Sequence, residues 1–150
     1  RAGFGSVMQE IALADLHAQL DADPANLGLL NAVASFYNIK KEYKKSLEYS
    51  IQVLEQEPLN KQALKNIIFG YRGRGETGNI LDYSNRYSMV DPEDINLQYI
   101  FGEIFAKTLR CQKAIPYLQQ VIKKDDTYRN AESLLNQCLQ YQREEEISAS

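Results

Sequence analysis

Hydrophobic residues recur along the chain at the three- and four-residue spacing of amphipathic helices. A first set is followed by a polar turn at residues 40–42 and then by a second set. The two sets are Leu27, Leu30, Val33, Ala34 and Tyr37, and then Tyr43, Leu47, Ile51 and Leu54. No stretch shows the sustained two-residue alternation of a half-buried strand, so the pattern predicts an all-α fold.

This arrangement of two helices repeats with a constant period. Pro24, Pro58 and Pro92 are equally spaced along the chain, and each follows the end of a predicted helix. Because proline cannot continue a helix, each one separates one pair of helices from the next. We therefore predict three helix pairs, over residues 27–60, 61–94 and 95–128.

The flanking segments are consistent with the same scheme. Residues 6–22 predict one amphipathic helix, which we interpret as the second helix of a partial N-terminal unit over residues 6–26. Residues 129–142 predict a capping helix, and we expect residues 143–150 to form a frayed tail. Since the sequence begins with Arg1 rather than Met, we expect it to be part of a longer chain.

The first period resembles the tetratricopeptide repeat (TPR), a helix–turn–helix unit of about 34 residues, which equals the spacing of the prolines. Its matching positions are Leu30, Val33, Ala34, Tyr37, Tyr43, Ser46, Val53 and Pro58. The third period matches through Phe101, Gly102, Phe105, Ala114, Leu118 and Val121, with Asp126 in place of the proline. The resemblance covers residues 27–128 and implies a right-handed α-solenoid, in which the first helix of each pair lines a concave wall.

The second period departs most from this pattern. Ile68, Ile80 and Tyr87 stand where the family usually has small residues. We expect these bulky side chains to open the angle of this helix pair or to shift its register. The glycine-rich stretch at residues 73–78 lacks the context of a phosphate-binding loop, and we interpret it as the turn between the two helices.

The concave wall implied by the resemblance is a candidate peptide groove. Its predicted residues lie off the hydrophobic stripe of each first helix. They are Asn31, Ser35, Asn38, Gln62, Lys65, Phe69, Arg72, Asn96, Tyr99, Glu103 and Lys107. Amides both donate and accept, as a peptide backbone does, while Phe69 and Tyr99 are candidate anchors for an apolar side chain. The alternative is that the amides only solvate a helix face and that Phe69 packs on a neighbouring helix.

The amino-acid composition argues against several classes of function. The chain has 150 residues and a formal charge of −3, which argues against general nucleic-acid binding. It has one histidine, His17, and two cysteines, too few for a typical zinc site or nucleophilic triad. We therefore expect no enzyme activity, no cofactor, no metal and no membrane insertion. We also expect Cys111 and Cys138 to remain unpaired, and His17 to be structural.

These inferences predict a protein-interaction module that holds a peptide or partner helix in the groove. The alternative is a structural scaffold that forms homo-oligomers through its open N-terminal end. Some proteins of the family grip the C-terminal carboxylate of chaperones with lysine, arginine and asparagine. Of the residues that such a clamp needs, only Asn66 is present, so we do not expect this role. The expected location is cytoplasmic, and a periplasmic or membrane-anchored parent protein is the alternative, since the sequence begins with Arg1.

Overall fold

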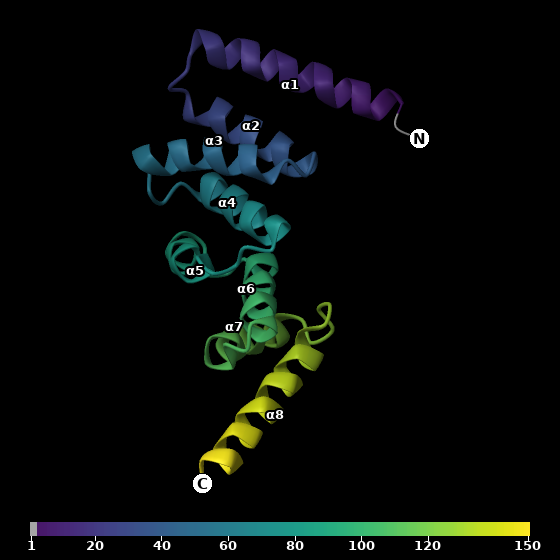
Figure 1. The fold of residues 1–150 in the computed structure, drawn as a ribbon, viewed down its shortest axis with the longest axis vertical. Helices are drawn as coiled ribbons and strands as arrows, with labels where there is room; N and C mark the ends of the chain where they lie inside the picture. The colour runs from purple at the N-terminus through teal and green to yellow at the C-terminus, as the bar shows by residue number, and fades with distance from the viewer. Residues whose placement is uncertain (1–2) are drawn as a thin grey trace. The chain divides into compact units, whose positions relative to one another are not determined.

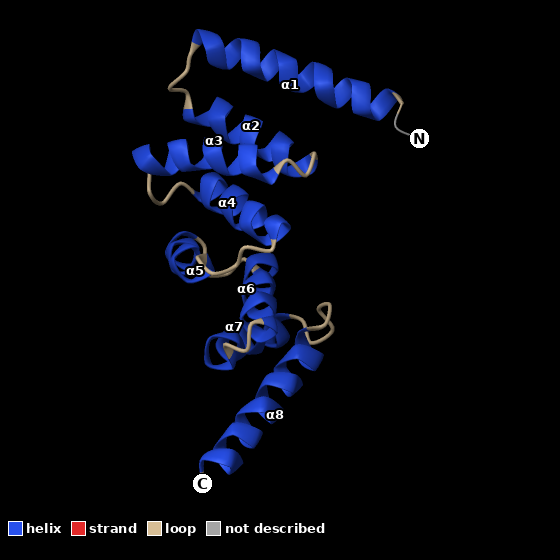
Figure 2. Ribbon diagram, in the orientation of Figure 1, coloured by secondary structure: helices blue, strands red, loops and turns tan. Residues whose placement is uncertain are grey.

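The structure, a computed structural model, describes residues 3–150, so Arg1 and Ala2 lie outside it. Its regular elements are all helices over this range, which confirms the predicted all-α class (Figures 1 and 2). They are α1 (Phe4–Ala22), α2 (Leu27–Ile39), α3 (Tyr43–Gln56), α4 (Lys61–Arg74), α5 (Ile80–Val90), α6 (Ile95–Lys107), α7 (Cys111–Lys124) and α8 (Ala131–Ala149).

The helices form two compact units, Arg1–Val90 and Asp91–Ser150. In the first unit α3 packs against both α2 and α4, while α1 contacts α2 and α5 contacts α4. In the second unit α7 contacts both α6 and α8, and α6 also contacts α8. The predicted pairs correspond to α2 with α3, α4 with α5, and α6 with α7. That one continuous array spans both units stays a prediction.

The first helix of each pair begins at a residue that caps its N-terminus. Asn26, Asn60 and Asp94 recur with the same period as the prolines. Each side-chain oxygen accepts a hydrogen bond from the backbone N–H three residues later, at 3.0, 3.0 and 3.2 Å. These bonds satisfy N–H groups that have no partner within the helix. Prolines mark the boundary in the sequence, and these caps determine where each helix starts.

The turn inside each pair also repeats. Lys41, Gly75 and Leu109 are again one period apart and have positive φ angles of 62°, 72° and 59°. In each case the next N–H donates to the carbonyl five residues back, at 2.8–2.9 Å, which closes the helix end. Gly75 therefore acts as the predicted turn residue. Gly73 does not, because it lies inside α4 directly beneath the ring of Tyr43.

The hydrophobic core of the second pair accommodates the bulky residues that depart from the family pattern. Ile68, Ile80 and Tyr87 are all completely buried. α4 and α5 still pack against each other as a pair. α5 has only 11 residues, whereas α3 and α7, the second helices of the other two pairs, have 14. In the third pair Gly102 has the expected small-residue role, because a Cβ there would lie 2.7 Å from Leu118. Small residues at this position let paired helices approach closely.

An aromatic cluster attaches α1 to the rest of the first unit. His17 Nε2 lies 2.8 Å from the hydroxyl of Tyr37, whose ring stacks on that of Tyr49. Burial, with a smaller effect from Tyr37, raises the pKa of the Tyr49 hydroxyl above its ordinary value. His17 therefore has the structural role expected from the sequence.

A disulfide joins Cys111, the first residue of α7, to Cys138 in α8. The expectation of unpaired cysteines was therefore wrong. The two residues are 27 positions apart, and packing of α8 on α7 brings their Cα atoms to 5.2 Å. Both are buried, at 4% and 2% exposure. α8 also continues to Ala149, so the segment that we expected to fray is helical here.

We expect reduction of this disulfide to destabilise the second unit. Closing a loop of this length restricts the unfolded chain, and its loss should lower the free energy of unfolding by about 3.5 kcal/mol. Urea denaturation followed by circular dichroism, with and without dithiothreitol, measures the change. The Cys111→Ser/Cys138→Ser double variant should match the reduced chain and ignore the reductant. An identical midpoint for the oxidised and reduced chains would contradict the prediction.

Candidate functional site

Polar side chains of α2 and α4 pair with one another across the contact between these helices. We call this set the α2–α4 polar network: Asn31, Ser35, Asn38, Asn60, Gln62 and Asn66. Four of these residues are predicted groove residues, and Asn60 and Asn66 are additional. α2 and α4 are the first helices of two consecutive pairs, so their polar sides lie next to each other and these side chains can pair.

Asn66 is the centre of the network and is only 3% exposed. Its Nδ2 donates to the backbone oxygen of Asn31 at 3.2 Å. Its Oδ1 accepts from the hydroxyl of Ser35 at 3.0 Å and from Gln62 Nε2 at 3.2 Å. The backbone oxygen of Asn66 accepts from Asn38 Nδ2 at 3.0 Å. The only match to the chaperone clamp is therefore committed to joining two helices.

The network changes the interpretation of the amides. Asn31 Nδ2 donates to the cap residue Asn60 at 3.1 Å, so the start of α4 is tied to the middle of α2. The Nδ2 groups of Asn31 and Asn38 are both used in the contact between α2 and α4, whereas the Oδ1 atoms of these two residues are buried without a hydrogen-bond partner. The main effect of the amides is to fix α2 against α4, since buried polar groups are costly unless they are hydrogen-bonded.

Three predicted groove residues of α4 remain accessible beside the network. Lys65 and Phe69 are half-buried, and Arg72 is exposed. They lie at the helical spacing that places them on one face with Gln62. We call Gln62, Lys65, Phe69 and Arg72 the α4 face. It offers one aromatic ring and two cations on a helix whose position the network holds, while the amide of Gln62 donates to Asn66.

The second unit uses its predicted groove residues differently. Tyr99 is only 2% exposed, because Tyr128 packs edge-on against its ring and Arg129 lies over it, 5.4 Å from the ring centroid. Asn96 Oδ1 accepts from the hydroxyl of Tyr128 at 3.4 Å. The loop before α8 therefore covers this part of α6, and Tyr99 is not an exposed anchor.

At the other end of α6, two predicted groove residues pair with each other. Lys107 Nζ lies 3.4 Å from Glu103 Oε2, one helical turn away. Glu103 is half-buried and Lys107 is exposed. A surface pair of this kind contributes little to stability.

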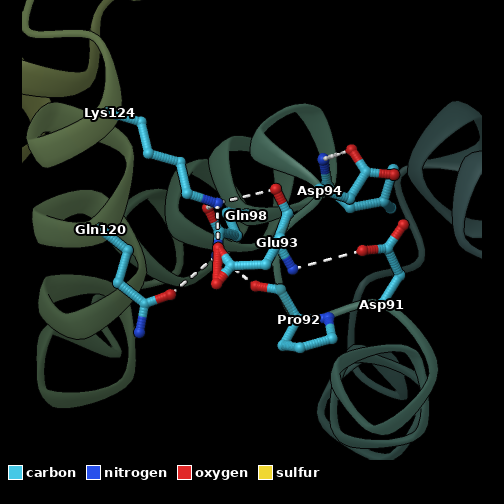
Figure 3. Close-up of polar contacts among 8 residues, drawn as sticks. Asp91, Pro92, Glu93, Asp94, Gln98, Gln120 and Lys124 are labelled. Carbon is cyan, nitrogen blue, oxygen red and sulfur yellow. Dashed lines mark hydrogen bonds and ion pairs between the residues drawn. The ribbon is translucent and has the colours of Figure 1, made fainter.

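A buried amide organises a second polar group in this unit, the Gln98 cluster (Figure 3). It comprises Pro92, Glu93, Gln98, Gln120 and Lys124. Gln98 is 4% exposed and donates to Gln120 Oε1 at 2.7 Å and to the carbonyl of Pro92. Lys124 Nζ lies 2.7 Å from both the carboxylate and the backbone oxygen of Glu93, and 3.4 Å from Gln98 Oε1. The cluster joins the segment before α6 to the end of α7.

The cap residues and the Gln98 cluster were not predicted from the sequence. The caps had a signal, because Asn26, Asn60 and Asp94 follow the proline period. Gln98 had none, since a single polar residue on a hydrophobic face gives no indication of its partners. Over residues 3–150 no group of three histidine, cysteine or acidic side chains is arranged to hold a metal. None of the helices described is both long and apolar enough to cross a membrane.

We expect Asn66→Ala to lower the free energy of unfolding by about 1–3 kcal/mol, because it removes the buried amide that joins α4 to Ser35 and to the backbone oxygen of Asn31. Asn85→Ala, on the exposed side of α5, is the matched control and should change stability by less than about 0.5 kcal/mol. Urea denaturation of both variants measures the difference. Equal stabilities would show that the network contributes nothing to the packing of α2 on α4.

Comparison with known proteins gives a clear result for structure and none for sequence. No protein-family model and no curated protein sequence matches the chain. Among solved structures, YrrB, described as a TPR protein with an unusual peptide-binding site, has a TM-score of 0.81 and 17% identity. That match covers 93% of this chain and 72% of YrrB.

Two further structures agree. A TPR protein from Parabacteroides merdae has a TM-score of 0.75 and 19% identity over 87% of this chain, which spans 52% of that protein. MamA from MSR-1 has a TM-score of 0.70 and 12% identity, with 82% of this chain and 71% of MamA covered. These likenesses confirm the resemblance inferred from the constant period of the sequence. The chain has the fold of tetratricopeptide repeat proteins.

Proposed function

We propose that the chain is a non-catalytic protein-interaction module that binds a peptide or partner helix on the α4 face. The observation that carries the proposal is Phe69, a half-buried aromatic ring between Lys65 and Arg72 on a helix held by the α2–α4 polar network. Partly exposed aromatic rings on a rigid support are typical binding hot spots. A surface that is already ordered also loses little entropy on binding.

The chemistry of the α4 face favours an acidic segment with an apolar residue. Lys65 and Arg72 lie on either side of Phe69 at helical spacing, so a partner carboxylate can approach on each side of the ring. The YrrB structure supports this class of function, because its description names a peptide-binding site on the same fold. Tyr99 is not part of the proposed surface, since it is buried.

Binding should depend on the ring of Phe69 and on the charge of Lys65. A randomised peptide library displayed on phage and selected against the full chain would supply the ligand. We expect Phe69→Ala to weaken binding of selected peptides about tenfold or more. Lys65→Glu should abolish binding of those that contain acidic residues. Fluorescence anisotropy measures both effects.

The matched controls are Ile51→Ala and Lys44→Glu, which make comparable chemical changes on exposed positions of α3. Far-UV circular dichroism verifies that every variant remains folded. If the controls weaken binding as much as the α4-face variants, or if Phe69→Ala binds normally, the proposed surface is wrong.

A specific observation also supports self-association as a second candidate function. Phe4, Val7, Met8 and Ile11 form an apolar stripe on α1 at helical spacing, with exposures of 82%, 53%, 47% and 58%. Figure 1 shows the N-terminal half of α1 extending past α2. An apolar stripe of this kind is typical of an interaction surface, and a second copy of the chain would bury it.

Self-association through this stripe should be sensitive to added charge. We expect Phe4→Asp/Ile11→Asp to shift the chain toward the monomer mass in a concentration series by analytical ultracentrifugation. Met89→Asp, which changes an isolated methionine of 72% exposure on α5, should have no effect. A monomer at all concentrations before any substitution would exclude this function.

The disulfide is informative about the cellular compartment in which the protein is found. Cytosolic thiols are kept reduced, whereas disulfides persist in oxidising compartments. The cytoplasmic location expected from the sequence stays a prediction, and the pairing of Cys111 with Cys138 argues against it.

A further inference from the structure

The disulfide between Cys111 and Cys138 lies at the edge of a hollow in the second unit. The hollow has a volume of about 660 Å³ and lies between the start of α7 and the second half of α8. Its lining includes Arg110, Cys111 and Lys113 on one side and Tyr141, Glu145 and Glu146 of α8 on the other. Cys138 does not line it. A small molecule that enters the hollow from solvent therefore meets the Cys111 end of the bond.

α8 is held mainly near its start. Its buried residues are Ala131, Leu134 and Cys138, and no residue from 139 to 149 is buried. α4, which follows α3 in the first unit as α8 follows α7, has six buried residues. The disulfide is therefore the last tight contact along α8, and the remainder of the helix depends on it for its position.

This sparse burial makes α8 the weakest part of the second unit once the bond is broken. A helix by itself is marginal in water, because most helical stability in proteins comes from packing. Segments with little buried apolar surface open at a lower free energy than the unit as a whole. α6 has eight buried residues, whereas α8 without the bond retains Ala131, Leu134 and the Cys138 thiol. We therefore expect α8 to detach before α6 and α7 separate.

The charges beside Cys111 favour its reaction with a thiolate. Cys111 is the first residue of α7, whose N-terminal end carries a partial positive charge and has no side-chain cap. Arg110 and Lys113 add two cations next to it, while Glu145 and Glu146 contribute carboxylates from α8. Reactive cysteines are typical of such electropositive, partly accessible settings, because negative charge on the sulfur is stabilised there. A disulfide whose reduced form is stabilised is also more easily reduced.

We propose that the disulfide is a redox-sensitive latch, which small thiols open through this hollow and whose opening releases α8 from α7. A thiolate from solvent forms a bond with Sγ of Cys111. The bond between the two cysteines breaks, and Cys138 leaves as a thiolate that takes up a proton. A second thiolate then attacks the sulfur of the attached reagent and releases Cys111. The reagent is oxidised to its disulfide, and the two electrons that it loses reduce the two cysteines.

Release of α8 changes the surface that the second unit presents. α8 covers part of both α6 and α7, since it contacts both helices. These parts become accessible only in the reduced chain, so the unit offers a partner one surface when oxidised and another when reduced. The latch is separate from the α4 face, which belongs to the first unit.

The first experiment tests whether the bond opens in the folded chain. Glutathione reduces the full chain, iodoacetamide traps the thiols, and mass spectrometry measures them over time. Because the hollow admits the reagent without unfolding, the rate should stay constant at urea concentrations below the unfolding transition. A rate that rises with urea in this range would show that the bond opens only through global unfolding, and would overturn the proposal.

The route of attack is tested by charge reversal. Glutathione is an anion at neutral pH, so Lys113→Glu, which reverses a charge lining the hollow, should slow reduction about threefold or more. Lys123→Glu makes the same change in the last turn of α7, away from the hollow, and should react as the unaltered chain does. Circular dichroism verifies that both variants remain folded. Equal rates for the two variants would overturn the proposal, because the hollow is then not the route.

Hydrogen–deuterium exchange tests the release of α8. After reduction, peptides from residues 131–141 should exchange about tenfold faster or more, and their loss of protection should exceed that of peptides from α7. Cys111→Ser/Cys138→Ser should show the same pattern without any thiol. If α6, α7 and α8 lose protection by the same factor, the bond only stabilises the unit as a whole and the proposal is wrong. Unchanged exchange in α8 would overturn it as well.

Discussion

A pair of short helices cannot bury its own apolar side, and within the first unit the helices therefore depend on contact with a neighbouring pair. α3 shows this most clearly, because it packs against α2 on one side and α4 on the other. Val33, Val53 and Ile67, from these three helices, are all completely buried. Repeat proteins in general gain stability from such contacts between neighbours, and the polar features of this chain are built on them.

Polar side chains refine the packing that the apolar residues establish. Asn66 joins α4 to α2, and Gln98 joins the segment before α6 to α7. Both are nearly inaccessible to solvent, where a satisfied amide specifies one arrangement and an unsatisfied amide is costly. The disulfide between α7 and α8 adds a covalent constraint in the second unit. Some of the residues whose type suggested a binding groove therefore hold helices together, and others lie on the surface.

The division is clearest among the predicted groove residues. Asn31, Ser35 and Asn38 are used within the α2–α4 polar network, and Tyr99 is covered by the loop before α8. Lys65, Phe69 and Arg72 retain accessible surface on α4. A helical periodicity identifies which side of a helix is apolar, but not what lies opposite its polar side. For that reason the candidate face is narrower than the predicted groove and excludes the second aromatic anchor.

The sequence alone was sufficient to predict the helices, their constant period and the turns at Lys41 and Gly75. Each of these features depends on residues that are close together in the sequence. The family resemblance followed from the same periodicity. The pairing of Cys111 with Cys138, the burial of Tyr99 and the partners of Gln98 were decided only in the folded chain. Each of these depends on residues far apart in the sequence, and only the packing of one element on another brings such residues together.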